Sequence, residues 1–264
     1  MPEGLEAEIW RVAASPLVGR TVSDVWVDER VASVGLRDAV VGAEIAGVDR
    51  VGKVLVVEMQ TSTGRTKLGL HFGMTGRLVV DGDAAIERLE YASGADRPSW
   101  DRLRLWTERD HRPADVPSLR LNDPRRLGRI SLDADLTQLG PDALTLTSAE
   151  LRRRLSGRRV AIKTALLDQS VVAGLGNLCV DEVLWTAGIA PHRPSDRLDA
   201  AEVTAIARAC RRRLPVMLRR GGSTMGELTP ELRRVAGDCP LDGTPLTRSK
   251  VGGRTTVWCP HHQL

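Results

Sequence analysis

The stretch ALLDQSVVAGLGNLCVDEVLWTAGIAP, residues 165–191, determines how the second half of this chain folds. Apolar residues recur at helical spacing on both sides of a Gly-Leu-Gly-Asn element, in which Gly174 and Gly176 interrupt the pattern. The stretch therefore predicts two helices joined by two turns. Backbone N–H groups at such a turn, directly before Asn177, can hold a phosphate. A helix hairpin that binds no ligand also uses such a turn, so two interpretations remain at this point.

Helical periodicity continues on both sides of this stretch. We expect helices at about residues 147–155, 160–169, 177–187 and 199–219. Thr147 and Glu150, three residues apart, have the spacing of a capping box at the start of the first of these helices. The second half of the chain is therefore predicted to be a helical lobe.

The first half of the chain has a different period. A helix is predicted over residues 5–14, with Leu5, Ile9 and Val12 on one face and Pro16 at its end. Short β-branched or alternating runs follow, separated by Gly, Asp and Ser turns, and this is typical of an antiparallel β-sandwich or barrel. The runs are TVSDVWVDERVASV (21–34), KVLVVEMQ (53–60), TKLGLHFG (66–73), GRLVVDG (76–82) and RLRLWTE (102–108).

Length and composition limit the class of protein. A chain of 264 residues can bury a substantial core, and we expect two lobes or domains. No apolar run approaches the roughly 20 residues of a membrane span, so no membrane partner is expected. The N-terminus is acidic where a signal peptide is basic, which predicts a cytoplasmic protein. Four scattered cysteines are too few for a disulfide scaffold and suit a reducing compartment.

Charge is distributed unevenly along the chain. Residues 151–220 contain 14 Lys and Arg against 6 Asp and Glu, a balance of +8, whereas the whole chain carries +4. The runs LRRRLSGRR (151–159) and RRRLPVMLRR (211–220) account for most of this excess. A polyanion such as nucleic acid would fit this basic region, and so would an arginine-rich helix face that only meets solvent.

The N-terminal stretch MPEGLEAE also has two interpretations. In the first, Pro2 and the carboxylates that follow simply favour the first turn of a helix. In the second, removal of Met1 exposes Pro2 as a secondary amine with a pKa of about 7.7–8.0, which can attack an electrophilic carbon. A carboxylate beside such an amine can donate and recover protons during the reaction.

The C-terminal segment combines a β-hairpin pattern with possible metal ligands. Cys239 and Asp242 are separated by two residues, as are Cys259 and His262, with sixteen residues between the pairs. This is the spacing of a four-ligand zinc ribbon, although only two of the four positions are thiols. We expect a structural zinc ion here, with His261 as a competitor for His262. A zincless hairpin that is held by packing alone is the alternative.

Together these motifs resemble the formamidopyrimidine-DNA glycosylase/endonuclease VIII family. The resemblance runs from residue 2 to residue 263 in the order of the family. It rests on MPEG-x-E-x-E at the N-terminus, HFGMTGRL (71–78), NDPRRLG (122–128), DQSVVAGLGN (168–177), AGIAP (187–191) and GGRTTVWC (252–259).

The resemblance implies an α+β fold with DNA in a cleft between two lobes. An N-terminal helix and an antiparallel β-sandwich would form a catalytic domain over residues 1–132. A helix-two-turns-helix DNA-binding domain would follow at 133–225, and a zinc-finger-like β-hairpin at 226–264. Such proteins excise oxidised bases from duplex DNA and cleave the abasic strand, and we expect this chain to act as a monomer.

The resemblance also assigns roles to single residues. Pro2 would be the nucleophile that attacks the sugar C1′, Glu3 the proton shuttle and Glu6 a supporting residue. Lys53, which on its own could be an ordinary exposed lysine at a strand end, would contact the phosphate beside the lesion. The family inserts an apolar wedge and an arginine where the damaged nucleotide leaves the stack. These residues match Met74, Arg125 and Leu127, and the other DNA contacts match His71, Lys163, Asn177 and Arg254.

The sequence leaves two alternative functions to be weighed, and it does not decide which damaged base is preferred. A non-catalytic relative that only binds damaged DNA would not need Pro2, Glu3 and Lys53 together. An unrelated enzyme that uses an N-terminal proline on small carbonyl compounds would not need the basic lobe. The MPEG start is closer to the endonuclease VIII branch and GMTGRL to the formamidopyrimidine branch, while Leu127 stands where the latter usually has phenylalanine. The preferred lesion therefore stays open between oxidised purines and pyrimidines.

Overall fold

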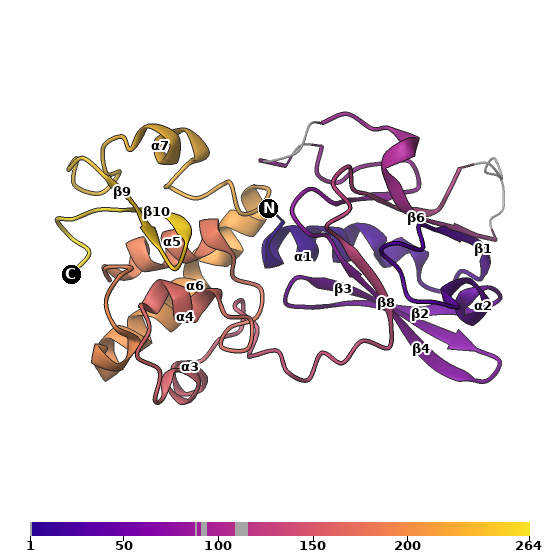
Figure 1. Cartoon of the computed structure of the whole chain (residues 1–264), viewed down its shortest axis with the longest axis horizontal. Helices are drawn as coiled ribbons and strands as arrows, with labels where there is room; N and C mark the ends of the chain where they lie inside the picture. Colours follow the sequence, from indigo (N-terminus) through magenta and orange to yellow (C-terminus); the bar gives the residue numbers. More distant parts are fainter. Residues whose placement is uncertain (1, 88, 91–93, 109–115) are drawn as a thin grey trace. The chain divides into compact units, whose positions relative to one another are not determined.

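The structure, a computed structural model, describes residues 2–87, 89–90, 94–108 and 116–264. Met1, for which we predict removal, lies outside the described residues. Contacts along the chain divide it into two compact units (Figure 1). The first consists of Pro2 and Glu6–Leu136, and the second of Glu3–Leu5 and Thr137–Leu264.

The first unit contains two four-stranded antiparallel sheets. The first has the order β1 (Val22–Val27), β6 (Asp101–Thr107), β7 (Leu119–Asn122), β5 (Arg77–Val80). The second has the order β2 (Glu44–Val51), β3 (Val54–Thr61), β4 (Gly64–His71), β8 (Arg129–Leu132). Inward-facing apolar residues of both sheets form one core, which includes Val25, Leu55, Leu68, Leu70, Leu103 and Leu121. The predicted antiparallel β-sandwich is confirmed.

The helix α1 (Gly4–Ala14) is confirmed, but its predicted apolar face is right only in part, since Leu5 is buried and Ile9 is half-buried. Val12 is 57% exposed, whereas Ala7, Trp10 and Ala14 are buried. The Trp10 ring packs on Phe72 with 4.0 Å between ring centroids, and this large contact sets the rotation of the helix. The other short helices of this unit are η1 (Ser15–Leu17), α2 (Leu36–Val40) and η2 (Pro98–Trp100).

The second unit is mostly helical, as predicted. Its helices are α3 (Ser148–Leu155), α4 (Ile162–Leu167), α5 (Asn177–Ala187), η3 (Ser195–Arg197), α6 (Ala200–Arg220) and α7 (Pro230–Val235). The expected capping box is present, because Thr147 Oγ1 accepts the N–H of Glu150 while the Glu150 carboxylate accepts the N–H of Thr147. Apolar faces of α3, α4, α5 and α6 share one core. Among the helices of the described residues, none is long and apolar enough to cross a membrane.

The C-terminal hairpin is also confirmed. Its strands are β9 (Thr247–Val251) and β10 (Arg254–Trp258), joined by Gly252 and Gly253. Both glycines have positive φ, +56° and +74°, as the tightest hairpin turns require. A small apolar cluster of Leu228, Cys239, Leu246, Val257 and Cys259 lies under the hairpin.

Candidate functional site

The N-terminal residues are anchored rather than frayed. Glu3 is 1% exposed, and within the second unit its carboxylate accepts the N–H groups of Gly176 (2.8 Å), Leu178 (2.8 Å) and Cys179 (3.1 Å). The N–H of Gly4 donates to Gly174 O at 2.8 Å. A side chain on Gly176 would collide with Glu3, so the Gly-Leu-Gly element provides this close approach.

These bonds decide the role of the turn before α5. The backbone N–H groups that could have held a phosphate hold the Glu3 carboxylate instead. A carboxylate at the N-terminus of a helix is stabilised by the same donors and dipole that would bind a phosphate. Of the two interpretations of this turn, the structure therefore favours the one without a phosphate, and the turn holds Glu3, the residue next to Pro2. Pro2 itself is buried, and Glu6 is 3% exposed in the first turn of α1.

Lys53 lies half-buried in the tight turn between β2 and β3. Arg50 holds this turn, because its Nη1 donates to Gly52 O at 2.8 Å while its Nε donates to the Glu8 carboxylate of α1 at 2.9 Å. Arg50 therefore links the turn that carries Lys53 to α1, and these hydrogen bonds fix the position of Lys53.

His71 ends β4, opposite the start of β3. Its Nδ1 accepts the backbone N–H of Gly73 at 3.2 Å. Burial, and then the nearby charges of Lys53 and Arg129, lower the pKa of His71 below its usual value of 6.5. The imidazole is therefore neutral at pH 7, and its Nε2–H is the donor that remains for a ligand.

Two loops of the first unit meet and carry Met74, Arg125 and Leu127. Arg125 and Leu127 are exposed, with Leu127 at 43%, and Met74 is half-buried. The loops approach closely, because a Cβ on Gly73, whose φ is +58°, would collide with the backbone of Leu127. The structure therefore brings these three predicted DNA contacts together on neighbouring loops.

Asp123 organises both loops and was not identified from the sequence. This carboxylate is fully buried and accepts Thr75 Oγ1 at 2.5 Å in one loop. In the other loop it accepts the N–H groups of Leu127 at 2.7 Å and Gly128 at 2.8 Å. The Asp-Pro dipeptide after a strand indicates a turn, but only the folded structure shows that Asp123 links two loops.

Lys163 is not at the surface. Its side chain is 0% exposed, and its Nζ donates to Asp181 Oδ1 at 2.6 Å and to Thr255 O at 3.0 Å. A buried ammonium cannot reach a phosphate, so the predicted direct contact of Lys163 with DNA does not hold in this structure. Asn177 Nδ2 donates to the same Thr255 O at 3.0 Å. Arg254, next to Thr255, is exposed at the start of β10.

The four predicted metal ligands come together. One donor atom from each of Cys239, Asp242, Cys259 and His262 lies within 4.8 Å of all the others. Cys239 Sγ is 3.7 Å from His262 Nδ1, and Cys259 Sγ is 3.4 Å from Asp242 Oδ2. Ligand atoms on a tetrahedral zinc ion are separated by roughly 3.3–3.8 Å, so this group can hold a metal ion.

Neighbouring groups orient these four side chains. His262 Nε2 lies 3.2 Å from Trp185 O, to which it can donate, and this leaves Nδ1 toward the group. Trp185 Nε1 donates to Cys239 Sγ at 3.3 Å. A hydrogen bond from the Thr244 N–H holds the pKa of Asp242 well below its usual range, so this carboxylate is ionised. His261 is 72% exposed, and His262 is therefore the better placed of the two histidines.

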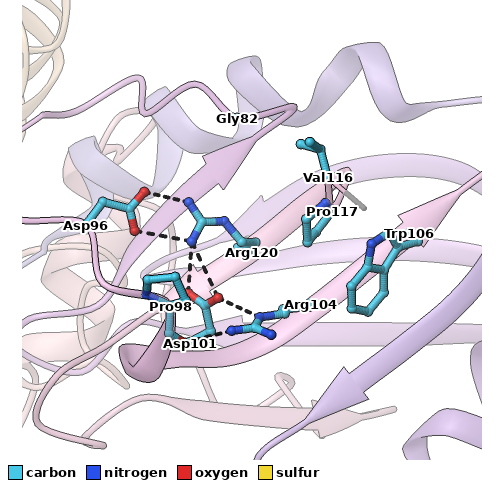
Figure 2. A pocket seen from close by; sticks show the side chains of 9 residues that line it. All are labelled: Gly82, Asp96, Pro98, Asp101, Arg104, Trp106, Val116, Pro117 and Arg120. Atoms are coloured by element: carbon cyan, nitrogen blue, oxygen red, sulfur yellow. Dashed lines mark hydrogen bonds and ion pairs between the residues drawn. The ribbon is translucent and has the colours of Figure 1, made fainter. Parts of the chain in front are cut away.

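A separate cavity of about 440 Å³ lies in the first unit (Figure 2). Its charged groups are already paired, since Asp101 contacts Arg104 at 2.7 Å and Arg120 at 3.1 Å, and Arg120 contacts Asp96 at 2.6 Å. The cavity is lined by Gly82, Asp96, Pro98, Asp101, Arg104, Trp106, Val116, Pro117 and Arg120. None of the predicted site residues lines it.

The chain was compared with known protein families and with curated proteins, and both comparisons match one family. The family model of the formamidopyrimidine-DNA glycosylase N-terminal domain matches residues 1–130, and that of the formamidopyrimidine-DNA glycosylase H2TH domain matches residues 139–228. A formamidopyrimidine-DNA glycosylase of Halorhodospira halophila is 34% identical over 290 residues, which cover 100% of both chains.

Solved structures agree as well. A complex of wild-type Lactococcus lactis Fpg (MutM) with DNA that contains N7-benzyl-Fapy-dG is similar with a TM-score of 0.80 and 26% identity, over 99% of each chain. A complex of Lactococcus lactis Fpg with DNA that contains an abasic site is similar with a TM-score of 0.79 and 25% identity, also over 99% of each chain. This chain belongs to the formamidopyrimidine-DNA glycosylase family and is a DNA-repair glycosylase.

Proposed function

We propose that this protein excises formamidopyrimidine-type and related oxidised bases from duplex DNA and then cleaves the abasic strand, with Pro2 as the nucleophile. The anchored N-terminus is the observation that carries this proposal. Glu3 and Gly4 make four hydrogen bonds to residues 174–179, so the residue that follows Pro2 has a fixed position. The related Lactococcus lactis proteins bind DNA with a formamidopyrimidine or an abasic site, which supports the same substrates here.

The chemistry follows from a secondary amine beside a carboxylate. After Met1 is removed, the Pro2 nitrogen attacks C1′, and the bond from C1′ to the base breaks with its electrons leaving on the base, which takes up a proton. Opening of the sugar ring transfers a proton to O4′ and leaves an iminium ion between Pro2 and C1′. This cation withdraws electrons, so that C2′ loses a proton and the 3′ phosphate departs. We assign the supply and recovery of these protons to Glu3, the carboxylate next to Pro2.

The other predicted residues divide into two groups. Lys53, His71, Asn177 and Arg254 are proposed to bind the DNA backbone, Lys53 and Arg254 as cations and His71 as a neutral donor. Met74, Arg125 and Leu127 are proposed to fill the gap that the extruded nucleotide leaves, since they share two exposed neighbouring loops. We propose that residues 1–132, 133–225 and 226–264 act as the catalytic, DNA-binding and hairpin segments.

Reductive trapping tests the proposed function. Borohydride reduces the Schiff base, so the wild-type protein should form a covalent complex with a duplex that contains an abasic site. Pro2→Gly, which keeps an N-terminal amine but not a secondary one, should reduce trapping by at least about 100-fold. Pro16→Gly, in η1 directly after α1, is the matched control and should leave trapping unchanged. A non-catalytic DNA-binding relative would bind the duplex but give no trapped complex.

We also propose that the hairpin holds one zinc ion through Cys239, Asp242, Cys259 and His262. When it is bound, zinc would stiffen a short hairpin that is marginal without support. Metal analysis of protein purified without a His-tag should find about one zinc per chain, and Cys239→Ser should lose it. His261→Ala should keep the zinc, because His261 is exposed whereas the Trp185 carbonyl orients His262. A metal-free wild-type protein with full activity would establish the zincless alternative.

A further inference from the structure

A buried cluster of charges links three helices of the second unit to the hairpin. Asp181 of α5 is 0% exposed and contacts Lys163 of α4 at 2.6 Å through Oδ1. Through Oδ2 it contacts Arg233 of α7, 7% exposed, at 2.8 Å. Two cations therefore share one carboxylate in a place from which water is excluded.

Such a cluster is a poor device for stability alone. Removing charges from water costs free energy that their mutual attraction repays only in part, and apolar residues of the same size often stabilise as well or better. Burial lowers the pKa of Lys163 even though Asp181 opposes this shift, which reflects the same cost. The best-attested use of buried charges is to fix one arrangement of neighbouring elements.

The element fixed here is β10. Lys163 Nζ and Asn177 Nδ2 both donate to Thr255 O at 3.0 Å, while the Val257 N–H donates to Asp181 Oδ2 at 3.2 Å. The hairpin turn also lies against α4, because a Cβ on Gly252 would approach Thr164 Oγ1 to 2.5 Å. The backbone is thus held on both sides of Arg254, whose side chain is exposed.

We propose that Lys163, together with Asp181, is a positioning residue that holds β10 in the one register in which Arg254 can contact a DNA phosphate. This rests on the proposed function, in which Arg254 is a backbone contact. Lys163 then contributes to DNA binding without touching DNA, and its whole contribution passes through Arg254.

A double-mutant cycle tests this directly. The dissociation constant for a duplex with a tetrahydrofuran abasic-site analogue is measured between 50 and 200 mM salt for Lys163→Met, Arg254→Ala and the double variant. Arg254→Ala should weaken binding and lower the salt slope by about 0.9, the value for one phosphate contact. Lys163→Met should do nearly the same, and the double variant should bind no more weakly than Arg254→Ala.

Three other results of the double-mutant cycle would overturn the proposal, each for a different reason. Additive losses, with a salt slope lowered by about 1.8 in the double variant, would mean that Lys163 contacts DNA itself and would overturn the proposal. Unchanged binding of Lys163→Met would overturn it too. Unchanged binding of Arg254→Ala would remove Arg254 from the DNA contacts and so overturn the positioning role of Lys163, whereas continued trapping through Pro2 would show that the proposed function itself still stands.

Two further variants guard the interpretation. Lys250 is exposed and pairs with Thr255 across the hairpin, so Lys250→Ala is the matched control and should combine additively with Arg254→Ala. Thermal unfolding checks that each variant is folded. If Lys163→Met does not fold, Lys163→Gln, which keeps an N–H donor, takes its place in the cycle with the same expectation of non-additive losses.

Discussion

Lys53 and Lys163 have the same predicted role but lie in different surroundings. Lys53 is half-buried in a tight turn of the first unit, and Arg50 stabilises that turn through a hydrogen bond to Gly52 O. Lys163 is fully buried in the second unit against Asp181. In the sandwich, buried residues support predicted DNA contacts that remain accessible. In the helical unit, Lys163 is itself part of the buried support. A motif identifies a position, but the surroundings decide whether its side chain binds a ligand or holds the fold.

The largest effect is expected at the buried support of the sandwich loops. Asp123→Ala removes a fully buried carboxylate and leaves the Thr75 hydroxyl and the N–H groups of Leu127 and Gly128 without their acceptor. The free energy of unfolding should fall by about 3 kcal/mol, measured by chemical denaturation. Asp38→Ala, which removes an exposed carboxylate of α2 in the same unit, should cost less than about 1 kcal/mol. Similar losses in both variants would break the distinction between buried support and exposed surface.

A smaller effect separates Lys53 and His71, the two proposed DNA-backbone contacts of the sandwich. Lys53→Met should lower the slope of binding against salt by about 0.9, because a charge is lost. His71→Gln should weaken binding but leave the slope unchanged, since burial and the neighbouring cations keep this imidazole neutral at pH 7. Binding titrations at several salt concentrations measure both slopes. A lower slope in His71→Gln would show that the imidazole carries a charge in the complex.

The smallest effect concerns pH. The pKa of His71 is lowered in the folded protein, so below about pH 6.5 the unfolded chain binds a proton that the folded chain resists. The contribution of His71 to stability is therefore fully present above that pH and is lost as the pH falls through the folded pKa. His71→Gln should flatten this part of the curve of unfolding free energy against pH. Parallel curves for both proteins would contradict the assigned burial of the imidazole.

The elements of the fold could be predicted from periodicity more easily than their contacts. The helices of the second unit, the capping box and the hairpin follow from local pattern. The strand β2 was not predicted, because its sequence EIAGVDRV is polar and interrupted by Gly47. The short strands β7 and β8 were missed as well. Val12 was wrongly placed on the apolar face of α1, because the contact of Trp10 with Phe72 outweighs the spacing of the smaller aliphatic residues.

In the candidate site too, local motifs could be predicted from the sequence, whereas contacts between distant residues could not. Motifs identified the metal group and the residues on the exposed loops, since these positions depend on short segments. Asp123, Asp181 and Arg233 were missed, because their roles depend on partners far away in the sequence. Phosphate binding stayed open for the turn before α5, because the sequence does not show that Glu3, 173 positions from Gly176, occupies its donors.

The most direct test of Pro2 as the nucleophile is to locate the trapped DNA on the chain. After borohydride reduction on an abasic duplex, tryptic digestion and mass spectrometry should place the adduct on the N-terminal peptide PEGLEAEIWR, residues 2–11, with Met1 absent and the Pro2 nitrogen modified. An adduct on the peptide VGKVLVVEMQTSTGR, residues 51–65, with cleavage blocked after Lys53, would make Lys53 the nucleophile and contradict the account.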